Sequence, residues 1–150
     1  MSAPAFRTIA HAIVARLVDQ ITYLKTCRFY GGEVEDVLAG MPFETPAAFV
    51  MFDVESPVDE SFDSLARRAS YLVVLAARSV EGRTVTTEDG AYSAHQIIED
   101  TVAALINDDL GLDEFSGLTL GAIRRYRITT TQAIYTIEVS AVVGRDKWTT

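Results

Sequence analysis

Two apolar segments in the middle of the chain decide the fold: Ala47–Val54, with the sequence AAFVMFDV, and Ser70–Ser79, with the sequence SYLVVLAARS. The first is a compact apolar run between a proline and an acidic stretch, which predicts a β-strand. The second is apolar and rich in β-branched residues. It lacks polar alternation, so it predicts a strand covered on at least one face. The polar and acidic residues between them, Ser56–Asp63, predict a loop.

An amphipathic helix is predicted on each side of this pair of strands. Residues 5–24 place apolar side chains at helical spacing, at Ile9, Ile13, Leu17, Ile21 and Leu24. From Ser93 onward a second stripe recurs at Ala94, Ile97, Ile98, Val102, Leu105 and Ile106. Ser93 and Gln96 predict a capping box at the start of this helix. We expect the helix to end near Asp109–Gly111, with Gly111 as its C-terminal cap.

The C-terminal third predicts two more strands, Ile123–Ile128 and Ile134–Val143, joined by a TTTQ turn. Between the first helix and the first strand the pattern is weaker. Cys27–Tyr30 fits a short strand, and Val34–Leu38 fits one helical turn.

The predicted order is therefore α-β-β-α-β-β in a single α+β domain spanning residues 1–150, with a polar tail from about residue 144. In this arrangement two helices cover one face of a mainly antiparallel sheet of about four strands.

Length and composition narrow the classes of function. The chain has 150 residues, with 13 Lys and Arg against 21 Asp and Glu, for a formal net charge of −8. Such a chain is a poor general binder of nucleic acid or of an anionic membrane. One cysteine excludes an intramolecular disulfide and any zinc site that needs two thiolates from one chain. With neither a signal peptide nor a membrane-length apolar run predicted, we expect a soluble cytosolic protein.

The charges are unevenly distributed along the sequence. Two stretches without Lys or Arg, between Arg28 and Arg67 and between Arg83 and Arg124, hold 17 of the 21 acids. The cations cluster in short groups, and 11 of the 13 are Arg. One interpretation is a solvated acidic surface that serves solubility. The other is a ring in which basic sites of one copy meet acidic flanks of the next. Such a ring would present a negative lumen through which DNA passes without binding.

Three residues are candidates for chemistry: His11, His95 and Cys27. A histidine pair serves acid–base work or a metal, but surface or helix-terminal positions are the simpler interpretation of both. Cys27 is a candidate thiol nucleophile, and we expect Lys25 and Arg28 to lower its pKa. The sequence contains no established nucleophile, phosphate-loop or metal-ligand motif. We therefore predict no catalytic residue, cofactor or metal. A small α+β enzyme or ligand-binding domain remains the alternative, and it requires a concave pocket where at least two of these three residues meet.

The order of segments along the chain resembles the Mu-like phage tail terminator proteins, also called tail completion or minor tail proteins. The resemblance runs from about Ala5 to Lys147. It rests on segment order and pattern: IAHAIVARL, TPAAFVMF, SYLVVLAARS, AHQIIEDTVAALI, LGLDEFSGLTLGAIRRY and AIYTIEVSAVV. One departure is the segment Glu55–Arg68, which is long and acidic for a simple hairpin. Either it forms a protruding arm, or the strand assignments around it are wrong.

The resemblance implies a ring, expected to be a hexamer, that caps the tail tube of a long-tailed phage. Such a ring ends tube polymerisation and presents the surface to which the head docks. It implies three partners: further copies of the chain, the tail tube protein and a head–tail connector protein. The protein would belong to the virion tail, be assembled in the bacterial host cytoplasm, and carry no catalytic residues. A head–tail connector or neck protein is the alternative within the virion.

Candidate contacts with other subunits or partners are the acidic segment, the arginine groups and two aromatic residues. They are Asp59, Glu60, Phe62, Asp63, Arg67, Arg68, Arg124, Arg125, Arg127 and Trp148. Each is equally interpretable as a plain surface residue, and Phe62 and Trp148 also as core residues.

Overall fold

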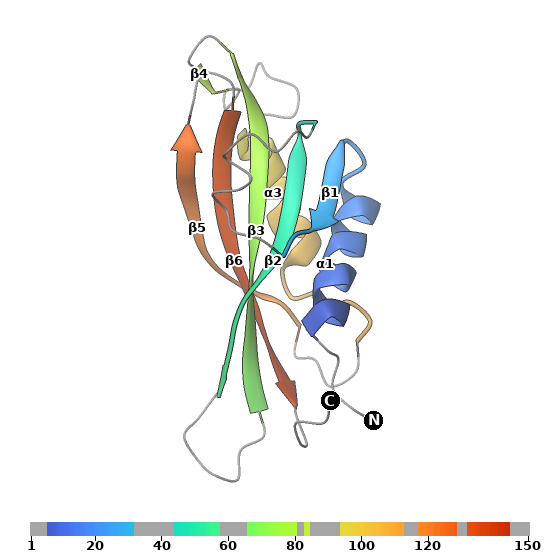
Figure 1. Cartoon of the computed structure of the whole chain (residues 1–150). Helices are drawn as coiled ribbons and strands as arrows, with labels where there is room; N and C mark the ends of the chain where they lie inside the picture. Colours follow the sequence, from blue (N-terminus) through green and yellow to red (C-terminus); the bar gives the residue numbers. More distant parts are fainter. Residues whose placement is uncertain are drawn as a thin grey trace.

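The structure is a computed structural model, and it describes residues 6–31, 44–57, 66–80, 83–84, 94–112, 117–128 and 132–144 (Figure 1). The described elements, in chain order, are α1 (Phe6–Gln20), β1 (Thr26–Phe29), β2 (Ala47–Pro57), β3 (Ala66–Val80), β4 (Arg83–Thr84), α3 (Ala94–Leu105), β5 (Thr119–Ile128) and β6 (Gln132–Gly144).

The main sheet has the strand order β1-β2-β3-β6-β5, and the two-residue strand β4 pairs with the end of β3. β1 pairs parallel with β2, and every other neighbouring pair is antiparallel. The predicted α+β class is confirmed, and the described part of the chain contains two helices. The predicted set of about four strands in the order α-β-β-α-β-β is wrong in detail, because β1 and β4 add to it and β1 makes the sheet mixed. The four residues of β1 are too few to show a hydrophobic period. They join the sheet by pairing with β2, and just before β1 the backbone N–H of Lys25 donates to the carbonyl oxygen of Pro46 at 2.9 Å.

Both helices contribute to one apolar core against one face of the sheet. Ile9, Ile13 and Leu17 of α1 are fully buried there, as are Ile97 and Leu105 of α3. Successive strand residues point to opposite faces of a sheet. Alternate residues of the two central strands therefore meet the helices: Ala69, Tyr71, Val73, Leu75 and Ala77 of β3, and Ala133, Ile137, Val139, Ala141 and Val143 of β6.

The opposite face of the sheet holds a second buried apolar cluster. Its buried members are Ala47, Phe49, Met51, Val74, Ala76 and Ile134. β2 and β3 are thus buried on both faces over this region. This explains why their sequences lack polar alternation, as expected for a strand with two covered faces.

The central hairpin is longer than predicted. β2 continues through Ser56 to Pro57 and β3 begins at Ala66, so part of the predicted loop Ser56–Asp63 is strand, and the rest lies outside the described residues. A bulge separates Phe52 from Val54. Figure 1 shows β2, β3 and β6 continuing toward the bottom of the view, past the end of α1.

The second helix ends earlier than predicted. α3 stops at Leu105, and Asn107 adopts the left-handed conformation (φ 60°) that follows many helix ends. Gly111 is also left-handed (φ 68°), but it lies beyond the helix end, so its assignment as the cap is wrong. Asparagine tolerates this conformation better than most residues, which allows the turn to begin before the glycine. The other predicted local features lie outside the described residues: the capping residue Ser93, the helical turn Val34–Leu38 and most of the TTTQ turn.

Candidate assembly surfaces

The terminal strand β5 carries the most exposed run of residues in the described sheet. Every residue from Ile123 to Arg127 is exposed, and the two large apolar side chains, Ile123 and Tyr126, are 46% and 42% exposed. The three predicted contacts Arg124, Arg125 and Arg127 lie in this run. We call Ile123–Arg127 the basic strand surface.

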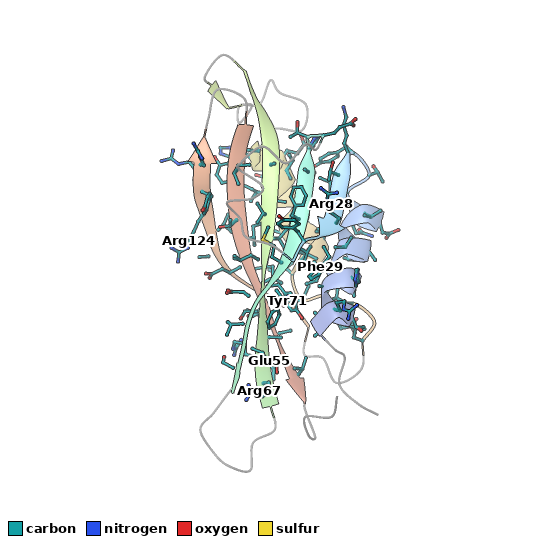
Figure 2. The ribbon with its side chains drawn as sticks, in the orientation of Figure 1. Arg28, Phe29, Glu55, Arg67, Tyr71 and Arg124 are labelled. Carbon is teal, nitrogen blue, oxygen red and sulfur yellow. The ribbon has the colours of Figure 1, made fainter. Side chains whose placement is uncertain are left out.

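The pairing with β6 sets the direction of each arginine. Arg124 lies opposite Thr136, and Arg127 opposite Ile134, on the helix-free face of the sheet. Arg125 lies opposite Tyr135, on the face that carries the helices. A register shift between Arg125 and Arg127 places these two arginines on opposite faces of the sheet. The main helix contacts are those of α1 with β1 and β2 and of α3 with β3, so side chains of β5 stay exposed on both faces. Figure 2 shows Arg124 projecting from β5 at the margin of the sheet.

The other predicted arginine pair separates onto two faces. On the helix side, Arg67 Nε lies 3.4 Å from Glu55 Oε2, and only 3% of the Glu55 side chain is exposed. Figure 2 shows these two side chains together at the lower end of the hairpin. Arg67 therefore holds the two strands of the hairpin together. Arg68 lies opposite Ser56 on the other face and is exposed. The remaining predicted contacts, Asp59, Glu60, Phe62, Asp63 and Trp148, lie outside the described residues.

Folding converts the uneven charge pattern into two layers. The helix layer carries the acids Asp19, Glu99, Asp100, Asp108 and Asp109, against the cations Arg7 and Arg16. By register, the helix-free face of the sheet carries Arg28, Arg68, Arg124 and Arg127, and the acid Glu138. Arg28 leans over the ring of Phe49, with its Cζ 5.5 Å from the ring centroid. Among the described residues, positive charge thus gathers on the helix-free face of the sheet and on β5, although the whole chain has a formal net charge of −8.

One exposed surface, at the bulge in β2, has no signal in the sequence. Phe52 and Val54 are 38% and 48% exposed, and Asp53 between them is exposed as well. We call Phe52–Val54 the acidic strand surface. The sequence predicts a strand here, and the bulge within it leaves no sequence signature. Across the bulge, Phe52 lies opposite Tyr71 and Val54 opposite Ser70, so the two apolar side chains leave the strand on opposite faces.

Two of the three candidate residues for chemistry, His11 and Cys27, lie where α1 meets β1, and the third, His95, lies at the start of α3. The ring of His11 packs at 5.5 Å from that of Phe29, and His95 is exposed at the start of α3. The Cys27 thiol lies 3.9 Å from the Val14 carbonyl oxygen. Burial raises its pKa from 9.0 to about 11, so the expected lowering by nearby cations is wrong. Desolvation disfavours the charged thiolate and outweighs exposed cations.

Within the described ranges, no three His, Cys, Asp or Glu side chains gather in a way that would hold a metal ion. None of the described helices has the length and hydropathy of a membrane-crossing helix.

Comparison with known proteins gives one family. The family model described as Bacteriophage Mu, Gp37 matches residues 6–142, which includes both helices and nearly all of the sheet. No curated protein matches the chain.

Proposed function

The chain belongs to the bacteriophage Mu Gp37 family, and on that premise we propose that it is a structural component of the phage tail. In this proposal several copies, expected to be six, form a ring that caps the tail tube. The ring ends tube polymerisation and offers the surface to which the head docks, through a connector protein. Its place is the virion tail, after assembly in the cytoplasm of the bacterial host, and DNA passes through its lumen without specific binding.

The observation that carries the proposal is the basic strand surface. Five consecutive exposed residues on a terminal strand, three of them Arg, suit contact with another protein better than they suit a monomer. Arginine and aromatic residues are enriched in protein interfaces and supply many of their energetic hot spots. The terminal position also favours docking, since an edge strand is where another chain most readily adds to a sheet.

The proposal assigns no catalytic chemistry to the chain. The single cysteine supports this view, since a thiol with a pKa of about 11 is almost entirely protonated at neutral pH. A nucleophilic cysteine needs the opposite shift, toward the thiolate.

The test of the proposal is native mass measured by light scattering on a sizing column, with the chain alone and with tail tube protein added. We expect a species of about six protomers that forms at high concentration or on tube ends. The paired charge reversal Arg124→Glu and Arg125→Glu should reduce its formation, while Arg7→Glu, on an exposed site of α1, should not. A chain that stays monomeric in both settings contradicts the proposal. Association with a head connector but not with the tube would instead identify a neck protein.

A further inference from the structure

We infer that the ring is closed by one repeated contact, in which the basic strand surface of one copy docks against the acidic strand surface of the next copy. This inference rests on the proposed function and names the pair of surfaces that would carry it.

The exposed apolar side chains point to this pair. The described residues contain six large hydrophobic side chains that are exposed, and four of them lie on these two surfaces. They are Ile123 and Tyr126 on β5, and Phe52 and Val54 on β2. Single exposed apolar residues are ordinary, but their concentration on two short strand segments marks those segments as contact sites.

The charges of the two surfaces are complementary. Three arginines lie next to the two exposed apolar residues of β5, and Asp53 lies between those of β2. Two copies of β5 would repel each other if they docked together, because six arginines would meet. The negative charge on β2 belongs to Asp53, since the neighbouring Glu55 carboxylate is buried against Arg67.

The two surfaces belong to different sides of one copy. β2 and β5 are separated by β3 and β6, so they lie about 14 Å apart across the sheet. The register places Phe52 level with Val139 and Arg125 level with Tyr135, an offset of about 13 Å along the strands. The surfaces therefore meet only between copies. A contact between two different surfaces of identical copies is head-to-tail, and it closes into a ring when the rotation allows.

Local geometry suits both segments to this role. A bulge at Asp53 and a register shift between Arg125 and Arg127 both interrupt the regular ladder. Bulges redirect side chains at sheet margins. Phe52 and Ile123, which lie opposite Tyr71 and Ile137, both leave their strands on the helix side. Docking would bring these two apolar side chains onto the same face of a joined pair of strands.

The test uses two single charge reversals and their mixture. Arg125→Asp alters only the basic strand surface, and Asp53→Arg alters only the acidic one. In a head-to-tail ring that pairs residue 125 of one copy with residue 53 of the next, each variant alone places like charges at this pair in every contact. An equal mixture can form an alternating ring in which residues 125 and 53 carry opposite charges in every contact, and the double variant in one chain has the same property.

We expect each single variant to need at least tenfold more protein than the wild type to form rings, alone or on tube ends. The equal mixture and the double variant should both recover most of the wild-type behaviour. Arg7→Asp is the matched control, and circular dichroism confirms that each variant is folded. A second test introduces Val54→Cys into one Cys27→Ser chain and Tyr126→Cys into another. On oxidation, a mixture of the two chains should form far more disulfide-linked dimer than either chain does alone.

Two outcomes overturn the inference while the proposed function stands. One is a wild-type ring that both single variants form equally well. The other is that both single variants form rings poorly and that neither their mixture nor the double variant recovers ring formation. That result would mean that a different partner binds one of the two surfaces. A wild-type chain that forms no ring, alone or with tail tube protein, is a distinct result that overturns the proposed function and this inference with it.

Discussion

Alkylation of Cys27 is expected to be slow in the folded chain, by an amount that follows from its burial. At pH 8 a thiol of pKa 9.0 is about 9% thiolate, whereas a thiol of pKa about 11 is about 0.1% thiolate, a loss of about ninetyfold. The more basic thiolate is the stronger nucleophile, and with a Brønsted coefficient of about 0.45 it regains about eightfold. We therefore expect iodoacetamide to react about tenfold more slowly with the folded chain than with the unfolded chain. Packing of Cys27 toward Val14 slows the reaction further.

The assay follows the labelled mass of the chain with time, between pH 7 and pH 11, in buffer and in urea. The folded rate should rise tenfold per pH unit up to about pH 11, while the unfolded rate levels off above about pH 9. Cys27→Ser corrects for labelling elsewhere. A folded rate that equals or exceeds the unfolded rate, or that levels off below pH 9, would refute the reasoning. It would also restore the thiol nucleophile as a functional candidate.

Three further predictions concern the stability of the fold. Arg16 Nε donates to a carbonyl oxygen in the last turn of α3 at 2.8 Å. Arg16→Met should therefore lower the free energy of unfolding by about 1–3 kcal/mol in urea titrations. The control Arg7→Met should stay within about 0.5 kcal/mol of wild type. Equal effects of the two substitutions would show that the hydrogen bond between the helices does not stabilise the fold. A Cβ on Gly121 would meet Glu138 Oε2 at 3.0 Å and Glu138 Cβ at 3.1 Å. Gly121→Ala should therefore lower the free energy of unfolding by about 1–3 kcal/mol. An unchanged urea midpoint would contradict this packing. Ile137 is fully buried between the sheet and the helices, so Ile137→Ala should cost about 2–5 kcal/mol, and a loss below 1 kcal/mol would place it outside the core.

The sequence predicts the long elements of this fold from two signals: a hydrophobic period in α1, α3 and β6, and continuous apolar runs in β2 and β3. The stripe of α1 and the alternation of β6 identify both elements within a few residues. A short strand at Cys27–Tyr30 fits the sequence and lies within one residue of β1, but its four residues show no period and do not reveal the parallel pairing with β2. The sequence also does not predict the length of the β2–β3 hairpin, because Ser56 and Arg67 are polar residues that lie in strands only through cross-strand pairing.

Some of the candidate contacts can likewise be predicted from the sequence, and others depend on the pairing of strands. The arginine cluster on β5 is visible as a sequence motif. The structure exposes all three arginines, with Arg124 and Arg127 on the helix-free face and Arg125 on the helix face. Arg67 looks equivalent in sequence, yet its partner Glu55 becomes its neighbour only through the strand register. Asp53 has no sequence signal at all, because a bulge is a property of two paired strands and not of one segment.

The central claim, a ring that caps the tail tube, is tested most directly by the length of tubes grown from purified tail tube protein with and without this chain. Electron microscopy measures the tube lengths and the density at their ends. The account predicts that the chain binds tube ends, stops elongation, and leaves shorter tubes, each ending in a ring. It also predicts that the variant Arg125→Asp loses this effect and that Arg7→Asp keeps it. Tubes that keep growing to the same length at saturating concentrations of the folded wild-type chain, with bare ends, would contradict the account.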